Sequence, residues 1–495
     1  MDDADVDVLI LGAGVSGVGA ACHVSRECPD RSFALLEMRD DLGGTWDLFE
    51  YPGIRSDSDM FTFGYSFRPW TETQTLADGA SIKQYVRETA ETYGVTDRIR
   101  YRRRVERVRW SDETRLWRVE ARDLETGETE TYTARFIIEC TGYYNYERGN
   151  EVDFPGESDF DGPAFHPQKW PEDLDYTDKR VVVIGSGATS VTLVPAMAEK
   201  AKHVTMLQRS PTYILSMPAE DRITEQLRRY LPEWLVYRIT RIRNILLQRF
   251  LYDVAQTFPD LSRRFIKDRI RQQVGEDFDM RHFSPDYDPW DQRLCVVPDG
   301  DLFDAIRRGD ASVVTDHIVR FTEEGILLEE GHDLEEGRVL EADVIVEATG
   351  LDIQMMGGVD VEVDGVDVAA SDRMVYRGAM FEDVPNFVTV FGYINASWTL
   401  KVDLVCQYTC RLLNYMAEHD YTKVVPTDHE GVETDGHAMD ELDAGYIERA
   451  ADRLPPKGKR APWKITNNYL YDWLNLSYGR LEDGVLEFSG GAPSI

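Results

Sequence analysis

Two short apolar runs, each followed by a glycine-rich turn and a helical stretch, set the pattern of the chain. The first run, Val6–Leu11, leads into GAGVSG at residues 12–17, and the second, at residues 181–184, leads into GSGATS at residues 185–190. A strand, a tight glycine turn and a helix in this order form the phosphate-binding unit of dinucleotide-binding domains. The sequence therefore predicts two nucleotide sites.

Each of these units is followed by an apolar run that ends in a Thr-Gly turn. Residues 136–142 are FIIECTG, and residues 343–350 are DVIVEATG. Buried return strands of this kind close such domains, and their duplication indicates a second domain inserted into the first. A helical pattern over residues 222–271 interrupts the second domain. We therefore predict an α/β fold with two Rossmann-like domains, the inserted one carrying a helical subdomain.

The position after the next strand differs between the two units. Glu37 follows an apolar run about 20 residues beyond the first glycines, where a carboxylate can accept hydrogen bonds from a ribose hydroxyl. Gln208 and Arg209 stand at the equivalent point of the second unit. An arginine there can pair with a 2′-phosphate, so the second site is predicted to bind NADP. The alternative for Arg209 is a solvated surface side chain.

Composition and charge narrow the possible partners. The 495 residues carry 90 acidic and 55 basic side chains, a formal net charge of −35, with 42% hydrophobic residues. An acidic surface repels polyphosphates, which disfavours nucleic acid and anionic membranes as partners of the whole surface, while the apolar content is that of a globular protein. The six cysteines show no metal-binding spacing, and no metal site is predicted.

The chain begins with an acidic segment that enters a strand at once, and it has no run of 18 apolar residues. These features predict neither a signal peptide nor a spanning helix, and so a cytoplasmic protein. The helical region at residues 222–271 is locally basic. It could touch a membrane surface, line the access to the NADP site, or simply present a solvated basic face.

The excess of acidic residues also predicts a cytosol of high salt concentration. Self-repulsion of the surface charges destabilises the fold at low ionic strength, and screening removes it as the Debye length falls from about 10 Å at 0.1 M to roughly 3 Å at 1 M. We therefore expect the thermal unfolding midpoint to rise as salt increases from about 0.1 M toward molar concentrations. Maximal stability at low salt would contradict the prediction.

The stretch between the two glycine loops carries a distinctive motif. Residues 160–171, FDGPAFHPQKWP, fit F-x-G-x-x-x-H-x-x-x-W-P through Phe160, Gly162, His166, Trp170 and Pro171. With two nucleotide loops around it, this motif resembles that of the type I Baeyer–Villiger monooxygenases, class B flavoprotein monooxygenases. The segments GGTWDLFEYPGIRSDSDMFT, SGATSVTLVPA, HVTMLQRSPTYI, NASWTLK and KITNNYLYD are similar to the subgroup of the mycobacterial ethionamide-activating monooxygenase.

This resemblance implies FAD in the first site and NADPH in the second. The expected domain limits are 1–143 and 352–495 for the FAD domain, 144–218 for the linker and first part of the NADP domain, 219–288 for the helical subdomain, and 289–351 for the rest of the NADP domain. The implied FAD contacts are Gly12, Gly14, Ser16, Gly17, Glu37, Thr45, Trp46, Asp57 and Val105. The implied NADP contacts are Gly185, Ser186, Gly187, Ala188, Thr189, Arg209 and Ser210.

By the same resemblance, Arg293 lies beside the flavin and Asp57 pairs with it. Many family members have Lys-Arg where this chain has Gln292-Arg293, so one positive charge toward the cofactor phosphate is missing. A structural ion pair is the alternative role for Arg293 and Asp57. Trp46 is expected to be either a core aromatic or a wall of the flavin site, and His166 a structural residue that controls the domains rather than a catalytic acid.

The activity implied is insertion of one O₂ oxygen next to a ketone carbonyl through a C4a-peroxyflavin, giving an ester or lactone. Arg293 would stabilise the peroxide anion, and Asp57 would hold the guanidinium in place. Small apolar ketones, and sulfides or thioamides, are the expected substrates. Two alternatives stay open, a mainly S- or N-oxygenating enzyme and an NADPH oxidase or flavin redox protein that forms no oxygenated product.

Overall fold

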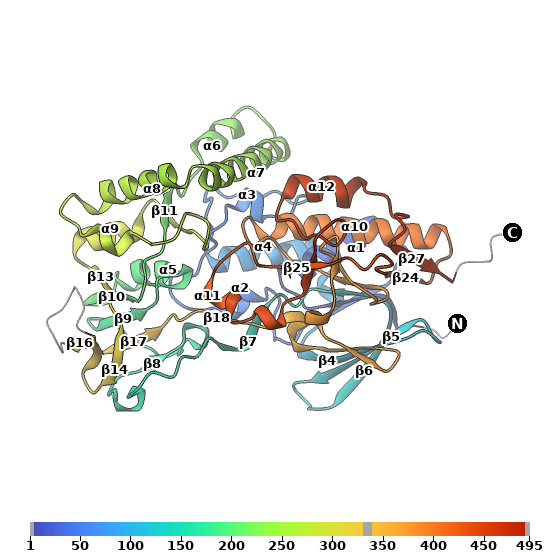
Figure 1. The fold of residues 1–495 in the computed structure, drawn as a ribbon, viewed down its shortest axis with the longest axis horizontal. Helices are drawn as coiled ribbons and strands as arrows, with labels where there is room; N and C mark the ends of the chain where they lie inside the picture. Colours follow the sequence, from blue (N-terminus) through green and yellow to red (C-terminus); the bar gives the residue numbers. More distant parts are fainter. Residues whose placement is uncertain (1–3, 330–338, 491–495) are drawn as a thin grey trace.

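The computed structural model describes residues 4–329 and 339–490, and its chain forms two α/β domains side by side (Figure 1). The large sheet of the first domain takes its strands from residues 6–139 and 360–389, and the smaller parallel sheet of the second takes its strands from residues 164–347. The second domain is inserted into the first and carries helices α6 to α8. This arrangement confirms the predicted fold class.

The first domain is built on one large sheet. Its parallel centre places β1 between β2 and β6, and residues 8–11 of β1 are fully buried, as expected for a strand covered on both faces. β23 also pairs with β6. The strands, in spatial order, are β20 (Val366–Val368), β19 (Asp360–Val363), β4 (Arg103–Ser111), β5 (Leu116–Asp123), β6 (Thr129–Glu139), β1 (Val6–Leu11), β2 (Phe33–Leu36) and β3 (Ile99–Arg100), with β23 at Phe387–Thr389.

Helices cover the parallel part of this sheet. The apolar side chains of α1, α4 and α10 join the strands in one core cluster, and α12 packs on α10. Cys406 and Cys410 are buried in this cluster. The helices are α1 (Val15–Glu27), α2 (Thr45–Leu48), α3 (Met60–Phe63), α4 (Gly79–Thr92), α10 (Trp398–Glu418), α11 (Gly445–Glu448) and α12 (Tyr469–Tyr478).

The second domain has a smaller parallel sheet of order β13-β10-β9-β17-β8. Its strands are β8 (Ala164–Phe165), β9 (Arg180–Ile184), β10 (His203–Gln208), β13 (Ala311–Thr315) and β17 (Val344–Glu347), and its helices are α5 (Ala188–Met197) and α9 (Asp301–Arg308). Short ribbons complete it: β11 (Ile214–Met217) with β12 (Cys295–Pro298), and β14 (Ile318–Thr322), β15 (Gly325–Leu328) and β16 (Val339–Glu341).

The chain crosses between the domains twice, and the two crossings pair with each other. β7 (Tyr144–Gly149) leaves the first domain, β18 (Leu351–Ile353) returns to it, and they form an antiparallel ribbon. The predicted linker, in the first part of the segment 144–218, thus contains β7 and β8 as well as irregular segments. The sequence did not predict these two strands, because the segment is rich in Pro and Gly and because each strand is short and pairs with a strand distant in sequence.

The helical subdomain bridges the two domains. It consists of α6 (Arg222–Arg228), α7 (Glu233–Thr257) and α8 (Pro259–Val274), which lie along the upper edge in Figure 1. Apolar side chains of α8, Ile266 and Ile270 among them, belong to the core of the second domain. By contrast, α7 contacts α3 of the first domain. Helices α7 and α8 therefore connect to different domains.

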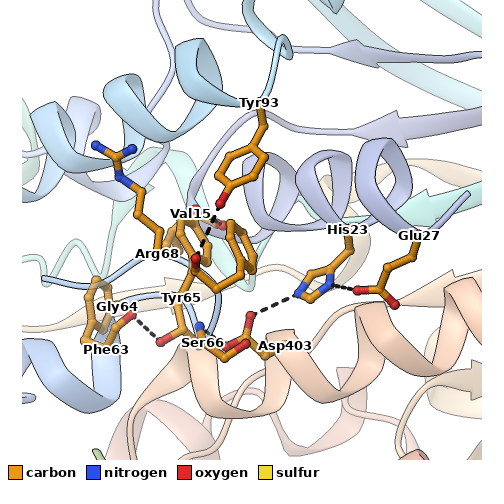
Figure 2. A network of polar contacts seen from close by, with 12 residues as sticks. Val15, His23, Glu27, Phe63, Gly64, Tyr65, Ser66, Arg68, Tyr93 and Asp403 are labelled. Carbon is orange, nitrogen blue, oxygen red and sulfur yellow. Dashed lines mark hydrogen bonds and ion pairs between the residues drawn. The ribbon is translucent and has the colours of Figure 1, made fainter. Parts of the chain in front are cut away.

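A buried polar network anchors α7 to the first domain. The Arg241 guanidinium pairs with the Asp403 carboxylate at 3.0 Å and donates to the carbonyl oxygens of Phe61 at 2.9 Å and Gly64 at 2.6 Å. The other Asp403 oxygen accepts from His23, whose second ring nitrogen lies 2.7 Å from Glu27 (Figure 2). Tyr65 links the region to the first glycine loop through its hydroxyl, which donates to the Val15 carbonyl.

Candidate functional site

A cavity of about 870 Å³ lies between the two domains and reaches both glycine loops. Its volume is near the upper end of the range for small-molecule and cofactor sites. Every residue predicted to contact a cofactor lines it except Gly17. The structure thus brings together side chains that the sequence separates by more than 200 positions.

The first glycine loop is shaped by close backbone contacts. A Cβ on Gly17 would lie 1.9 Å from the Gly12 carbonyl oxygen, and one on Gly12, whose φ is +94°, would lie 2.8 Å from the Cys140 oxygen. These contacts let β1, the loop and α1 pack tightly and aim the start of α1 at the cavity. The loop has the geometry of a phosphate cradle.

Glu37 closes this loop from the next strand. One carboxylate oxygen accepts from the Ala13 N–H at 2.7 Å and the other from the Arg39 N–H at 2.8 Å. Burial raises the pKa of Glu37, while these two hydrogen bonds oppose that shift. Glu37 also lines the cavity, where it can accept hydrogen bonds from a ribose.

Other predicted contacts surround the same end of the cavity. Gly44 lies against Gly14, so that a Cβ on Gly44 would be 2.9 Å from the Gly14 Cα. Thr45 is 3.2 Å from the Tyr146 hydroxyl. Trp46 packs edge-on against Phe63 at 5.7 Å while also lining the cavity, so it serves both as a core aromatic and as a wall. Val105 lines the cavity from β4.

The second glycine loop has a similar construction. Gly185 has a φ of +130°, and a Cβ there would lie 2.4 Å from the Ala348 oxygen. Gly187 precedes α5, which begins with Ala188 and Thr189. The Ser186 hydroxyl donates to the Ser210 carbonyl oxygen at 3.0 Å, which joins the loop to the segment after β10. Arg209 precedes Ser210 there, with its side chain exposed and lining the cavity.

Arg293 and Asp57 meet in the cavity from opposite domains. The Arg293 guanidinium lies 2.8 Å from one Asp57 oxygen and 2.9 Å from the other, and 36% of the Arg293 side chain is exposed. The charge of Asp57 raises the pKa of Arg293 above its ordinary value, so the side chain remains a cation. The pair places a fixed positive charge where both domains face the cavity.

Several cavity residues were not predicted as site residues. Tyr143 and Tyr144 have their hydroxyls 2.6 Å apart, and Tyr143 stacks on Trp398, whose indole N–H donates to Ser16 at 2.8 Å. Burial raises the pKa of Tyr446 to about 12, so it is a neutral donor near Arg293. Arg449 also lines the cavity.

These residues had weak sequence signals. Tyr143 directly follows the CTG turn, and Trp398 lies in the segment NASWTLK, so their neighbourhoods were visible. Tyr446 and Arg449 lie in an acidic, irregular region without a motif.

The motif residues lie outside the cavity and organise the second domain. Phe160 packs edge-on near Phe321, and a Cβ on Gly162 would lie 2.5 Å from the Asp343 oxygen. Trp170, followed by Pro171, packs against Phe165 of β8. These contacts hold β8 beside β17 at the edge of the sheet.

His166 connects this motif to the segment that leads back to the first domain through β18. Its Nδ1 accepts from the Gln168 N–H at 3.2 Å, so its Nε2–H donates to the Gly350 carbonyl at 2.9 Å. Burial lowers the pKa of His166, which favours the neutral ring. His166 does not line the cavity, and its contacts lie at the domain junction.

Within residues 4–329 and 339–490, no group of three or more His, Cys, Asp or Glu side chains could hold a metal ion. No helix of that part of the chain is long and apolar enough to cross a bilayer.

The chain is similar to known flavin enzymes over nearly its whole length. MymA of Mycobacterium tuberculosis is 52% identical over 490 residues, 98% of each chain. The FAD-containing monooxygenase EthA of the same organism is 49% identical over 486 residues, also 98% of each chain. Among solved structures, OTEMO in complex with FAD and NADP has a TM-score of 0.75 at 23% identity, covering 99% of this chain and 100% of that one.

The flavin-binding monooxygenase-like family matches residues 5–357, which include both glycine loops, the motif at 160–171 and Arg293. The similarity to the mycobacterial proteins confirms the resemblance found in the sequence. The chain belongs to the flavin-binding monooxygenase-like family.

Proposed function

We propose that the protein is an FAD- and NADPH-dependent monooxygenase of the Baeyer–Villiger type, which also oxygenates sulfides or thioamides. A ketone, O₂, NADPH and a proton would give an ester or lactone, NADP⁺ and water. The single observation that carries the proposal is the Arg293–Asp57 pair, a fixed cation in the cavity between the two nucleotide loops.

The residues present fit both cofactors. The first loop, Glu37, Thr45 and Val105 would hold FAD, and the second loop with Arg209 would hold NADPH. Family membership supports the flavin, and the OTEMO complex, which contains FAD and NADP, supports the pair. When bound, FAD supplies the redox chemistry by accepting hydride from NADPH and passing electrons to O₂.

The protein's own contribution is electrostatic. Negative charge develops on oxygen as it is transferred to the carbonyl carbon, and the Arg293 guanidinium is positioned to stabilise it. A well-placed donor of this kind contributes about 3 to 4 kcal/mol. Asp57 restricts the orientation of the guanidinium, while Tyr143 and Trp398 form an apolar wall that limits water.

Product analysis under ¹⁸O₂ tests the proposal. The holoenzyme is given NADPH with a panel of small ketones and sulfides, and products and NADPH consumption are both quantified. We expect one ¹⁸O atom in an ester or lactone, with about one NADPH consumed per product. Oxygenation of sulfides alone would assign the protein to the S-oxygenating enzymes, and NADPH consumption without any oxygenated product would make it an oxidase.

A further inference from the structure

Two arginines from different domains line the cavity that reaches the second glycine loop. Arg209 follows β10 of the second domain, and Arg449 follows α11 of the first. Both line the cavity, and the Arg449 guanidinium lies 3.7 Å from where Gly350 of the second domain would carry a Cβ. Burial lowers the pKa of Arg449; the charge of Asp352 opposes this shift, and the positive charge of Arg209 adds to it.

Neither arginine is neutralised by the protein. Over residues 4–329 and 339–490, no carboxylate lies within 4 Å of either guanidinium, although the chain has 90 acidic residues. Two like charges that face the same cavity repel each other, and Asp352 and Glu448 offset the charge of Arg449 only from beyond ion-pair distance. A doubly charged anion held between them would remove this cost.

We propose that Arg449 and Arg209 together bind the 2′-phosphate of NADP(H). This inference rests on the proposed function. It also accounts for Gln292, which stands where many related sequences have a lysine, because Arg449 supplies a second positive charge from another part of the chain. Since the two arginines belong to different domains, the phosphate would connect them when the cofactor binds.

Affinity measurements on the FAD-loaded protein test this assignment. We expect Arg449→Gln to weaken NADP⁺ binding about 10- to 100-fold while changing NAD⁺ binding less than about twofold, because only NADP⁺ carries the 2′-phosphate. Arg449→Lys should retain most of the affinity. The matched control is Arg453→Gln, which removes a nearby arginine that is paired with Asp352 at 2.9 Å. Titration calorimetry gives each dissociation constant.

The outcomes separate the alternatives. An equal loss for NADP⁺ and NAD⁺ would place Arg449 elsewhere along the cofactor, and unchanged NADP⁺ binding would remove it from the site; either overturns the inference. The wild-type protein tests the proposed cofactor independently. If it binds NADP⁺ no better than NAD⁺, the NADPH assignment itself fails, whatever the variants do.

A second, independent observation concerns the outer face of the helical subdomain. On α7, Ile242, Leu246 and Phe250 follow one another at four-residue spacing and are 59%, 50% and 61% exposed, and on α8 Phe265 is 55% exposed. Helix α12 adds exposed apolar residues, and its Tyr469 packs in the same cluster as Ile245 of α7. These three helices form what we call the α7–α8–α12 face, at the top of Figure 1.

The charge of this region is opposite to that of the rest of the chain. Residues 222–274 contain twelve arginines and lysines against five acidic residues, a formal charge of +7 within a chain of −35. Arg238 lies over the ring of Trp234 at 5.6 Å, and Arg269 over that of Phe265 at 5.8 Å. Exposed apolar side chains flanked by arginines and aromatics are typical of helices that lie in a membrane interface.

We infer that the α7–α8–α12 face binds the surface of an anionic lipid membrane. Its apolar side chains would enter the acyl boundary, and its arginines would contact lipid phosphates. A second copy of the chain fits less well, because pairing this face with itself would bring the arginines of both copies together.

Co-sedimentation with vesicles tests this inference. Vesicles made of equal parts of phosphatidylglycerol and phosphatidylcholine should carry the FAD-loaded protein into the pellet. The double substitution Phe250→Glu and Phe265→Glu should reduce the bound fraction at least about 10-fold. Val366→Glu, at a 61% exposed apolar position on β20, is the control and should bind as the wild type does. Unchanged FAD content shows that each variant is folded.

Two results would overturn the membrane assignment. One is wild-type protein that stays in solution with anionic vesicles both at 0.1 M and at 1 M salt. The other is light scattering that shows a lipid-independent dimer, which the Phe250→Glu and Phe265→Glu substitutions dissociate; the face would then be a self-association surface.

Discussion

Arg293→Ala is expected to leave FAD bound and flavin reduction by NADPH measurable, while ester formation falls about 10²- to 10³-fold or to background. The guanidinium lies 2.8 Å from Asp57 in the cavity between the two domains. In the proposed function its charge stabilises the negative charge that develops on oxygen. Reduction followed by flavin absorbance and product followed by chromatography separate the two effects.

A matched control distinguishes charge from domain docking. Arg55 also bridges the domains, with its guanidinium 2.5 Å from Asp301, and its removal breaks a comparable contact. We expect Arg55→Ala to retain most ester formation and Arg293→Lys to recover part of it, since lysine keeps the charge but not the planar geometry. Undiminished ester formation in Arg293→Ala would reduce the Arg293–Asp57 pair to a structural contact.

Asp403→Ala is expected to cause the largest loss of stability, about 3–5 kcal/mol. The carboxylate is almost fully buried between Arg241 at 3.0 Å and His23 at 3.1 Å. Removing it leaves a buried guanidinium without its counter-charge and weakens the attachment of α7 to the first domain. Denaturant unfolding followed by tryptophan fluorescence gives the change in the free energy of unfolding.

Asp253→Ala is the control for this substitution. Asp253 pairs with Arg249 on the same helix at 2.7 Å, but both side chains are exposed, so its loss should cost at most about 0.5 kcal/mol. Equal losses in the two variants would show that burial of the Asp403 network contributes nothing.

The same network should make stability depend on pH. Burial opposes protonation of His23, but its hydrogen bonds to Asp403 and Glu27 outweigh burial and raise its pKa. A pKa that is higher in the folded state than in the unfolded state stabilises the fold. This contribution is complete below the unfolded-state pKa of about 6.5, and it is lost as the pH rises through the folded-state pKa. We therefore expect the unfolding free energy to fall above about pH 6.5, and less so in His23→Gln.

Most of the fold could be predicted from patterns of residues that are neighbours in the sequence. The two glycine loops, Glu37 and Arg209 were visible because a strand, a turn and a helix occur next to one another in the sequence, and the geometry of such units is nearly invariant. The repeated return strands likewise indicated the inserted domain. These features depend on neighbouring residues, so the amino-acid order alone was sufficient.

What was missed depends on distant contacts. Arg241 and Asp403 are 162 positions apart, and no pattern near either predicts their pairing. Arg449 and Arg209 line the same cavity although they are 240 positions apart in the sequence. β7 and β8 are too short to give a periodic signal, and they are strands because β18 and β17 lie beside them. Such residues are identified by the folded arrangement and not by spacing.

The pairing of β7 with β18 bears on how the protein could have been assembled in evolution. Gly149 lies opposite Leu351, so everything between them leaves and rejoins the first domain at neighbouring points. The entropic cost of closing a loop grows slowly, by about 0.6 kcal/mol per doubling of its length. The inserted domain can thus be lengthened, shortened or replaced at this ribbon, while the first domain keeps its sheet and its first glycine loop.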